Sequence, residues 1–425
     1  MVVPPEFLKS LTKRLGVSEG ELQVLLDTLE GEDLSAIAQK LGVQRNALQK
    51  RLGEVYKKFR IEGSGPGKFA KLQKIILEEY QKQVNQQKTP EKTIDLRDAP
   101  VVGTFFDRTE ELTQGTTYLI KERYPIVAIC GMGGMGKSVF AVRLVEQIAD
   151  DYDYIFWRNL SLRSLPTLDN LIHDLISFFN PQDTEKEGNH LSSSADLIEH
   201  FRRDRCLVIL DNYESLFQSQ TFAGYYQPNY ESYGELIKQI AQTRHQSNLL
   251  IISRETPLEL MSLVGDKLQN PMIILKGLTQ NGINQLLTQK GINPDETTLN
   301  QLMKHSSGHP VALNQLAFTV QTLFDGNLPD LLKQDTIFIS EIMSNYLSKQ
   351  LDHLSALERE IIEQLAVVSE GLTLTEIQNT LSQVNNLSEV MTALSSLNRR
   401  YLLEKVTHGT STRFTIIPIL KQYVN

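Results

Sequence analysis

The chain has 425 residues, of which 40% are hydrophobic and 22% charged, and its formal net charge is −8. That length exceeds one ordinary hydrophobic core and predicts two to four globular domains. With no run of about 18 apolar residues and no signal-peptide pattern at the N-terminus, the sequence predicts a cytoplasmic protein and argues against a membrane-spanning one.

The charge is unevenly distributed along the chain. Residues 36–74 contain ten Lys or Arg against two Glu, although the whole chain is acidic. A basic patch on an acidic protein indicates a local interaction surface. Nucleic acid is one candidate partner for it, and a merely solvated helix face is the alternative.

The first 62 residues are predicted to form short, closely spaced helices. Glu19–Glu30 is amphipathic, with leucines at helical spacing. Leu34–Leu41 predicts a second helix and Gly42-Val43 a tight turn. A third helix is expected from about Gln44 to Phe59. This layout is typical of a helix-turn-helix.

The motif GMGGMGKS, Gly131–Ser138, has the G-x-x-x-x-G-K-[S/T] spacing of a P-loop. The apolar run Ile126–Cys130 before it predicts a buried strand, and Val139–Ala149 after it has helical periodicity. In such a turn, backbone N–H groups and the helix N-terminus bind a phosphate chain. Lys137 is placed to reach the β- and γ-phosphates, and Ser138 to bind Mg²⁺. The nucleotide-binding residues predicted here are Gly131, Met132, Gly133, Gly134, Met135, Gly136, Lys137, Ser138 and Val139.

Strands and helices alternate from about residue 101 to 277, which predicts a doubly wound parallel sheet. Strand-like apolar runs occupy Tyr154–Leu160, Cys206–Leu210, Leu249–Ile252 and Met272–Leu275. A ligand of such a sheet lies at the C-terminal ends of the strands. The motif residues fall at those ends.

Asp211 follows one of these buried runs and can place a carboxylate beside Mg²⁺, as the partner of Ser138. The next residue is Asn212, whose amide cannot act as a base, and Glu214 is an acid that could replace one. We therefore predict ATP hydrolysis that is slow or absent. Arg254, at the end of a later strand, is placed to sense a γ-phosphate, and a surface salt bridge is its alternative role.

Beyond the predicted sheet, Leu278 to about Tyr346 shows helical patterns without a convincing strand. Residues 347–425 begin as helices and end in two short strand-like runs, Tyr401–Lys405 and Phe414–Ile417, which predict a winged helix. The predicted fold is a multidomain α/β protein, whose parts are an all-α helix-turn-helix domain with a helical extension (1–88), a linker (89–100), a P-loop NTPase domain (101–277), a helical bundle (278–346) and a winged helix (347–425).

The order of these motifs resembles the NB-ARC group of signal-transducing ATPases over roughly residues 100–425. FFDRTEEL is similar to the family's entry motif, in which Arg108 matches an arginine near the nucleotide and Asp107 replaces the usual glycine. IISRE is similar to the sensor strand, with Arg254 as the matching arginine. SSGHPVAL is similar to the G-x-P motif, so the resemblance places Gly308 and Pro310 near the base and ribose.

The resemblance implies a molecular switch with ADP or ATP and Mg²⁺ as ligands, closed and monomeric with ADP and assembling with itself when ATP replaces it. Family winged helices often carry Met-His-Asp, whose histidine holds the ADP β-phosphate. Here Ile417 occupies that position, so the lock is missing. Family members normally continue into C-terminal sensor repeats beyond the point that corresponds to Asn425. The chain is therefore expected to be a fragment or to use another molecule as its sensor.

Residues 21–61 resemble a LuxR-type helix-turn-helix, in which the third helix enters the major groove. Arg, Asn and Gln can read base edges, and lysines suit phosphates. Gln44 and Ala47 depart from that family's usual serine cap and phosphate-binding threonine, so recruitment of an effector protein is the alternative to DNA. The predicted DNA-binding face consists of Arg45, Asn46, Gln49, Lys50 and Arg51.

Three function classes remain open from the sequence. One is the signalling switch, and the second is an ATP-gated, DNA-binding transcription regulator. The third is a turnover ATPase or a small-molecule kinase, against which Asn212 argues because it offers no base.

Overall fold

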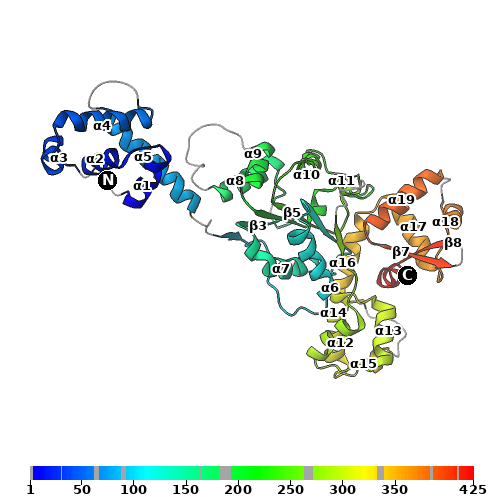
Figure 1. Ribbon diagram of the computed structural model, residues 1–425. Coiled ribbons are helices and arrows are strands. Elements are labelled where there is room, and N and C mark those ends of the chain that lie inside the picture. Colours follow the sequence, from blue (N-terminus) through cyan, green and yellow to red (C-terminus); the bar gives the residue numbers. More distant parts are fainter. Residues whose placement is uncertain are drawn as a thin grey trace. The chain divides into compact units, whose positions relative to one another are not determined.

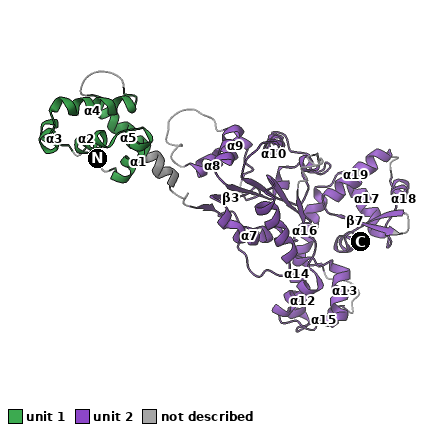
Figure 2. Ribbon diagram, in the orientation of Figure 1, with its two compact units in different colours: residues 1–91 green, residues 92–425 purple. Residues whose placement is uncertain are grey.

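The computed structural model describes residues 3–29, 31–61, 67–87, 92–162, 164–180, 193–262, 271–332, 339–382, 386–408 and 411–425. The chain divides into two compact units, residues 1–91 and residues 92–425, which Figure 2 shows in separate colours. Within the described residues, no helix is long and apolar enough to cross a membrane.

The N-terminal unit is helical, as predicted. Two small cores hold it together, one of which joins Val24, Ile37 and Leu48 from three successive helices. Asp33 caps the third helix of the chain, and Gly42 ends it at a φ of +66°, a left-handed conformation that suits glycine. The helices are α1 (Pro5–Arg14), α2 (Glu19–Leu29), α3 (Leu34–Leu41), α4 (Arg45–Lys58) and α5 (Gly67–Gln87).

The second unit contains a six-stranded, fully parallel sheet in the order β1-β3-β4-β5-β2-β6 (Figure 1). Strands β2, β4 and β5 are buried along their whole length, and β3 is buried at its centre, as expected for strands covered by helices on both faces. The predicted parallel α/β architecture is therefore confirmed. The strands are β1 (Thr93–Asp95), β2 (Ile126–Cys130), β3 (Tyr154–Asn159), β4 (Cys206–Asp211), β5 (Asn248–Ser253) and β6 (Met272–Ile274).

The edge strand β1 corrects one prediction, because its residues fall in the segment 89–100 that we expected to be a linker. Thr93 pairs with Tyr154 and Asp95 with Phe156, so the sheet begins before residue 101. The strand is only three residues long, and Ile94 remains 46% exposed. So short an edge strand produces no run of apolar residues in the sequence.

Two apolar cores lie on the two faces of the sheet, with successive residues of β2 pointing into different ones. Val127 and Ile129 belong to one core, and Ile126 and Ala128 to the other. The helices of this part are α6 (Thr109–Thr116), continued by a π-helical turn η1 (Thr117–Lys121), α7 (Lys137–Ile148), η2 (Ala149–Asp151), α8 (Leu168–Phe179), α9 (Ser194–Arg203), η4 (Tyr213–Leu216), α10 (Ser232–Gln242) and α11 (Leu258–Ser262).

Helices α12–α15 enclose a third core, and later helices with a β-hairpin follow. The antiparallel hairpin pairs Leu403 with Ile416, close to the two strands expected near the C-terminus. One helix, α16, runs across the predicted boundary at residues 346 and 347. The elements are α12 (Gln280–Gln289), α13 (Glu296–Ser306), α14 (Pro310–Leu323), α15 (Leu328–Leu332), α16 (Glu341–Asp352), α17 (Ala356–Val367), α18 (Leu374–Thr380), α19 (Leu387–Arg399), β7 (Leu403–His408), β8 (Ser411–Ile416) and α20 (Pro418–Val424).

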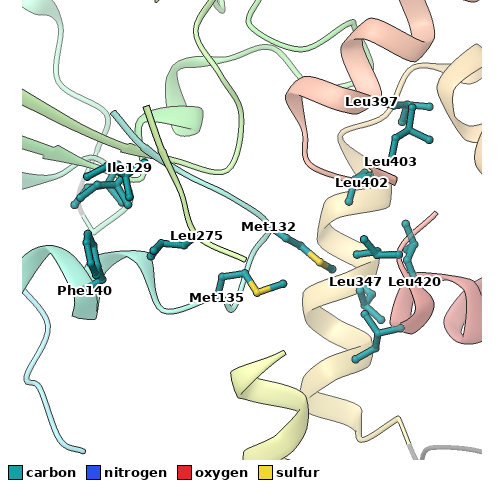
Figure 3. Close-up of a cluster of buried hydrophobic side chains, with 14 of the residues drawn as sticks. Ile129, Met132, Met135, Phe140, Leu275, Leu347, Leu397, Leu402, Leu403 and Leu420 are labelled. Carbon is teal, nitrogen blue, oxygen red and sulfur yellow. The ribbon is translucent and has the colours of Figure 1, made fainter. Parts of the chain in front are cut away.

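One continuous apolar cluster connects the sheet to the C-terminal helices. It includes Met132 and Met135 from the turn after β2 and Leu347 from α16, together with Leu402 and Leu420. Figure 3 shows Met132 directed toward the α16 side chains. The turn after β2 is therefore packed against the C-terminal part of the same unit.

Candidate functional site

The glycine-rich turn between β2 and α7 adopts conformations that require its glycines. Gly131, Gly134 and Gly136 have φ values of +145°, +80° and +84°, which residues with a side chain rarely adopt. A Cβ added to Gly131 would also lie 2.5 Å from the carbonyl oxygen of Leu275. Helix α7 begins at Lys137, directly after the turn, so the N-terminus of the helix lies at the glycine-rich turn.

Lys137 is buried and bonded to the turn itself. Its Nζ donates to the carbonyl oxygens of Gly131 at 2.8 Å and Met132 at 2.9 Å. Burial lowers the pKa of Lys137 to about 8. The ammonium group is thus held at the mouth of the turn, where the P-loop spacing places it.

Ser138 and Asp211 are brought together, as the sequence predicted, by the adjacent positions of α7 and the end of β4. Ser138 Oγ donates to Asp211 Oδ1 at 3.0 Å. Burial raises the pKa of Asp211 to about 6, although the hydrogen bonds from Ser138 and Asn212 oppose that shift. A hydroxyl and a carboxylate are the hard oxygen ligands that Mg²⁺ prefers, so the pair fits the ion.

Glu214 and Arg254 form an ion pair, with Arg254 Nε 3.1 Å from Glu214 Oε1. The other carboxylate oxygen accepts from the backbone N–H of Arg254 at 3.1 Å. Asn212, which has a φ of +55°, directs its amide to Asn159. Glu214, the acid that could act as a catalytic base, is therefore paired with Arg254, the arginine that we predicted to sense phosphate.

Arg108 is buried and bonded to protein groups. It donates to the Lys276 carbonyl oxygen at 2.6 Å and pairs with Glu111 at 3.0 Å. Arg108 and the preceding Asp107 have φ values of +101° and +57°. A positive φ is easiest for glycine, the residue that the resemblance leads us to expect in place of Asp107. The Asp107 carboxylate accepts from the Thr279 N–H at 2.9 Å, which ties this segment to the start of α12.

Gly308 and Pro310 lie at the start of α14, with Pro310 in the first turn of that helix. The residue between them, His309, was not predicted to act. It is fully buried, and its Nε2 lies 2.8 Å from the carbonyl oxygen of Gly133 in the glycine-rich turn. Its position between a glycine and a helix-starting proline was the only sequence signal for it.

Elements distant in sequence converge on Gly133. A Cβ added to Gly133 would lie 3.5 Å from Arg254 Nε and 3.5 Å from Gln350 Nε2 of α16. A small cavity beside it is lined by Glu214, Arg254, Gln350, His353 and Arg400. The turn therefore lies beside the end of β5, the start of α14 and the last turn of α16.

A second feature that the sequence did not reveal is a buried charge cluster centred on Arg400. Its guanidinium contacts Glu255, the residue after Arg254, and pairs with Glu358 of α17 at 3.1 Å. It also donates to the Thr221 carbonyl oxygen at 2.8 Å. Ile417, the residue that the sequence resemblance matches to the histidine lock, is buried in the apolar cluster.

The predicted basic face of the N-terminal unit lies on α4. Arg45, Asn46, Gln49 and Lys50 are exposed. Arg51 is half-buried, and its guanidinium packs against Gly20 of α2. Four of the five predicted residues therefore share an accessible surface, whereas Arg51 is partly withdrawn from it.

Residues 108–223 match the family model of the NB-ARC domain, a stretch that contains the glycine-rich turn and Asp211. This part of the chain is therefore similar to an NB-ARC domain. An uncharacterised WD repeat-containing protein of Nostoc sp. is 34% identical to it over 345 residues, which is 78% of this chain and 27% of that protein. The chain thus matches about a quarter of the length of its curated relative.

One solved structure supports the fold of the second unit, and another is more remote. A Walker-type ATPase of Pyrococcus abyssi has a TM-score of 0.53 and 14% identity, covering 75% of this chain and 96% of that one. A signal transduction ATPase with numerous domains, which carries a tetratricopeptide repeat sensor in Pyrococcus horikoshii, has a TM-score of 0.39 and 16% identity, covering 79% and 44%. The first similarity indicates a shared P-loop ATPase fold, and the second is too remote to add to it.

Proposed function

We propose that this protein is an ADP/ATP-dependent molecular switch. The observation that carries the proposal is the convergence at the glycine-rich turn. The ends of the adjacent parallel strands β2, β5 and β4 bring together Lys137, the Ser138–Asp211 pair and Arg254. Residues of α14 and α16 lie beside the same turn. A site that contacts several parts of a chain can couple its ligand to their arrangement.

The ligand is a nucleoside diphosphate or triphosphate with Mg²⁺. The backbone N–H groups of the turn and the N-terminus of α7 suit phosphate oxygens. Ser138 and Asp211 would hold the magnesium ion, which neutralises phosphate charge when it is bound. The remaining residues proposed for the nucleotide are Arg108, Gly308 and Pro310, at the entry segment and the start of α14.

Any hydrolysis is slow, in our proposal, so that the bound nucleotide determines a long-lived state. Asn212 cannot act as a base, and Glu214 is paired with Arg254 at 3.1 Å. With ADP the chain is closed and monomeric, and with ATP it opens and assembles with further copies. The longer relative is named as a WD repeat-containing protein, which favours repeats as the sensor of the proposed switch.

The nucleotide site is tested by calorimetric titration of the full chain with Mg-ADP and Mg-ATP. Lys137→Ala removes the ammonium group and leaves the rest of the chain unchanged. The fold should therefore survive while tight nucleotide binding is lost. Circular dichroism confirms the fold of the variant. Wild-type affinity in the folded Lys137→Ala protein would contradict the assignment of the site.

A second candidate function, a DNA-binding regulator gated by nucleotide, is favoured by the exposed basic face of α4. We propose that α3 and α4 form a helix-turn-helix, that Arg45, Asn46, Gln49 and Lys50 would face the groove, and that Arg51 contributes less because it packs on α2. Fluorescence anisotropy with duplex DNA across a salt series separates the partners. Binding with a steep salt dependence, lost on replacing Arg45 and Lys50, favours DNA, whereas no binding at low salt favours an effector protein.

A further inference from the structure

His309 makes two hydrogen bonds through its two ring nitrogens. Nδ1 accepts from the backbone N–H of Ala312 at 3.3 Å, which caps the N-terminus of α14. Nε2 lies 2.8 Å from the carbonyl oxygen of Gly133. Because Nδ1 is an acceptor, the hydrogen of the neutral ring is on Nε2, which donates to Gly133.

The surroundings of His309 keep the ring neutral. Burial lowers the pKa of His309 to about 4, with a smaller contribution from the charge of Lys137, although the hydrogen bond to Gly133 opposes the shift. The N-terminus of α14 also disfavours a positive charge at this position. One tautomer therefore satisfies both hydrogen bonds at once near neutral pH.

Close backbone contacts fix where this ring can lie. A Cβ added to Gly277 would be 1.7 Å from the Ser307 carbonyl oxygen, and one added to Gly308 would be 2.2 Å from the Leu278 carbonyl oxygen. The Leu278 N–H donates to the Gly308 carbonyl oxygen at 2.8 Å. The segment after β6 and the start of α14 thus form one rigid support for His309.

The bond to Gly133 has a consequence for phosphate binding. In a trans peptide, the carbonyl of Gly133 and the N–H of Gly134 belong to one plane and point in opposite directions. A donor that holds the carbonyl toward α14 therefore turns the Gly134 N–H away from α14. A Cβ on Gly134 would lie 2.5 Å from His309 Cε1, so the ring also closes this side of the turn.

We propose that His309 is a positioning residue for the nucleotide diphosphate. It orients the Gly133–Gly134 peptide so that an N–H group faces the phosphates, and it links the phosphate site to α14. This inference rests on the proposed nucleotide function and extends it to a residue outside the motif residues we predicted.

Two variants separate the functions of the two ring nitrogens. His309→Asn retains an acceptor near the Nδ1 position and is a favoured N-cap, but it is too short to reach Gly133. His309→Gln places an amide donor near the Nε2 position and loses the cap. The full chain is titrated with Mg-ADP by calorimetry, and the thermal unfolding midpoint is measured for each variant.

The Asn variant should bind Mg-ADP about tenfold more weakly, the usual effect of losing one hydrogen bond, with a midpoint close to that of the wild type. The Gln variant should show the reverse, a lower midpoint with affinity near that of the wild type. A purely structural histidine would not produce that crossed pattern. Wild-type affinity in the folded Asn variant, or an affinity loss in the Gln variant as large as in the Asn variant, would overturn the inference.

A failure of the proposed nucleotide function would give a different result from a failure of the His309 inference. If the wild type binds no Mg-ADP, or if Lys137→Ala binds as well as the wild type, the nucleotide site itself is wrong, and the inference falls with it. If the wild type binds and Lys137→Ala does not, the two His309 variants decide the inference alone.

Discussion

Two glycines with nearly the same backbone conformation show how contact, rather than φ alone, determines the identity of a residue. Gly308 has a φ of +70° and Gly291 a φ of +76°. A Cβ on Gly308 would meet a backbone oxygen at 2.2 Å, whereas one on Gly291 would meet nothing within 4 Å. Both positions disfavour a side chain, but only the first also requires the backbone to shift.

Substitution by alanine should separate these two effects. Gly291→Ala should reduce the free energy of unfolding by about 1 kcal/mol, the usual penalty for a left-handed alanine. Gly308→Ala should reduce it by about 1–3 kcal/mol more, because an overpacked contact is added to that penalty. Urea denaturation measures both variants, and equal losses would show that the contact with Leu278 does not determine the choice of glycine.

At the residue scale, the sequence could predict the side chains that belong to a spaced motif. Lys137 bonds to the turn after β2 and Ser138 pairs with Asp211, whereas their binding of nucleotide and Mg²⁺ stays a prediction. His309 and Arg400 could not be found, because their partners lie 176 and 145 residues away along the chain. Pairings of that kind depend on tertiary packing, which one sequence does not encode in a local pattern.

At the scale of elements, the end of α19 is joined to the end of β5 and to α17 by a cluster of buried charges. Arg400, Glu255 and Glu358 are each less than 9% exposed. Two further hydrogen bonds run beside them, from the Thr256 N–H to the Arg399 carbonyl oxygen and between the Thr256 and Tyr401 hydroxyls. This joint begins one residue after Arg254, so the proposed phosphate sensor and the joint share one strand end.

Arg400→Met should destabilise the protein by about 3–5 kcal/mol, because it leaves two buried carboxylates without a cation. Arg413→Met is the matched control, since the ion pair of Arg413 with Glu376 is partly exposed and should contribute about 1 kcal/mol or less. Chemical denaturation compares the two variants. A loss for Arg400→Met no larger than that of the control would show that the cluster does not hold these elements together.

The predictability of elements depended on their length and burial. The bounds of α3 agree with the predicted helix, because this helix buries Ile37 and has a side-chain cap, Asp33, at its N-terminus. The strand β1 was missed because three residues at an edge, with an exposed isoleucine, have no periodicity to recognise. The helix-turn-helix, the winged helix and the predicted domain boundaries remain predictions.

At the scale of the molecule, helices α16–α20 and the β-hairpin do not form an independent body beside the sheet. Their apolar side chains belong to the same cluster as Met132 and Met135 of the glycine-rich turn (Figure 3). A nucleotide that changes the turn must therefore act on the packing of α16 as well. Ile417 is buried in the same cluster, so the C-terminal elements are held to the sheet by apolar packing together with the Arg400 joint.

In the proposed switch, the identity of the bound nucleotide determines whether the chain is a monomer or an assembly. The most direct test is multi-angle light scattering of the full chain at one protein concentration, with Mg-ADP and then with a non-hydrolysable Mg-ATP analogue, at saturations verified by calorimetry. A switch of this kind should have the mass of a monomer with ADP and the mass of a larger assembly with the analogue. The same mass with both nucleotides, each shown to be bound, would contradict it.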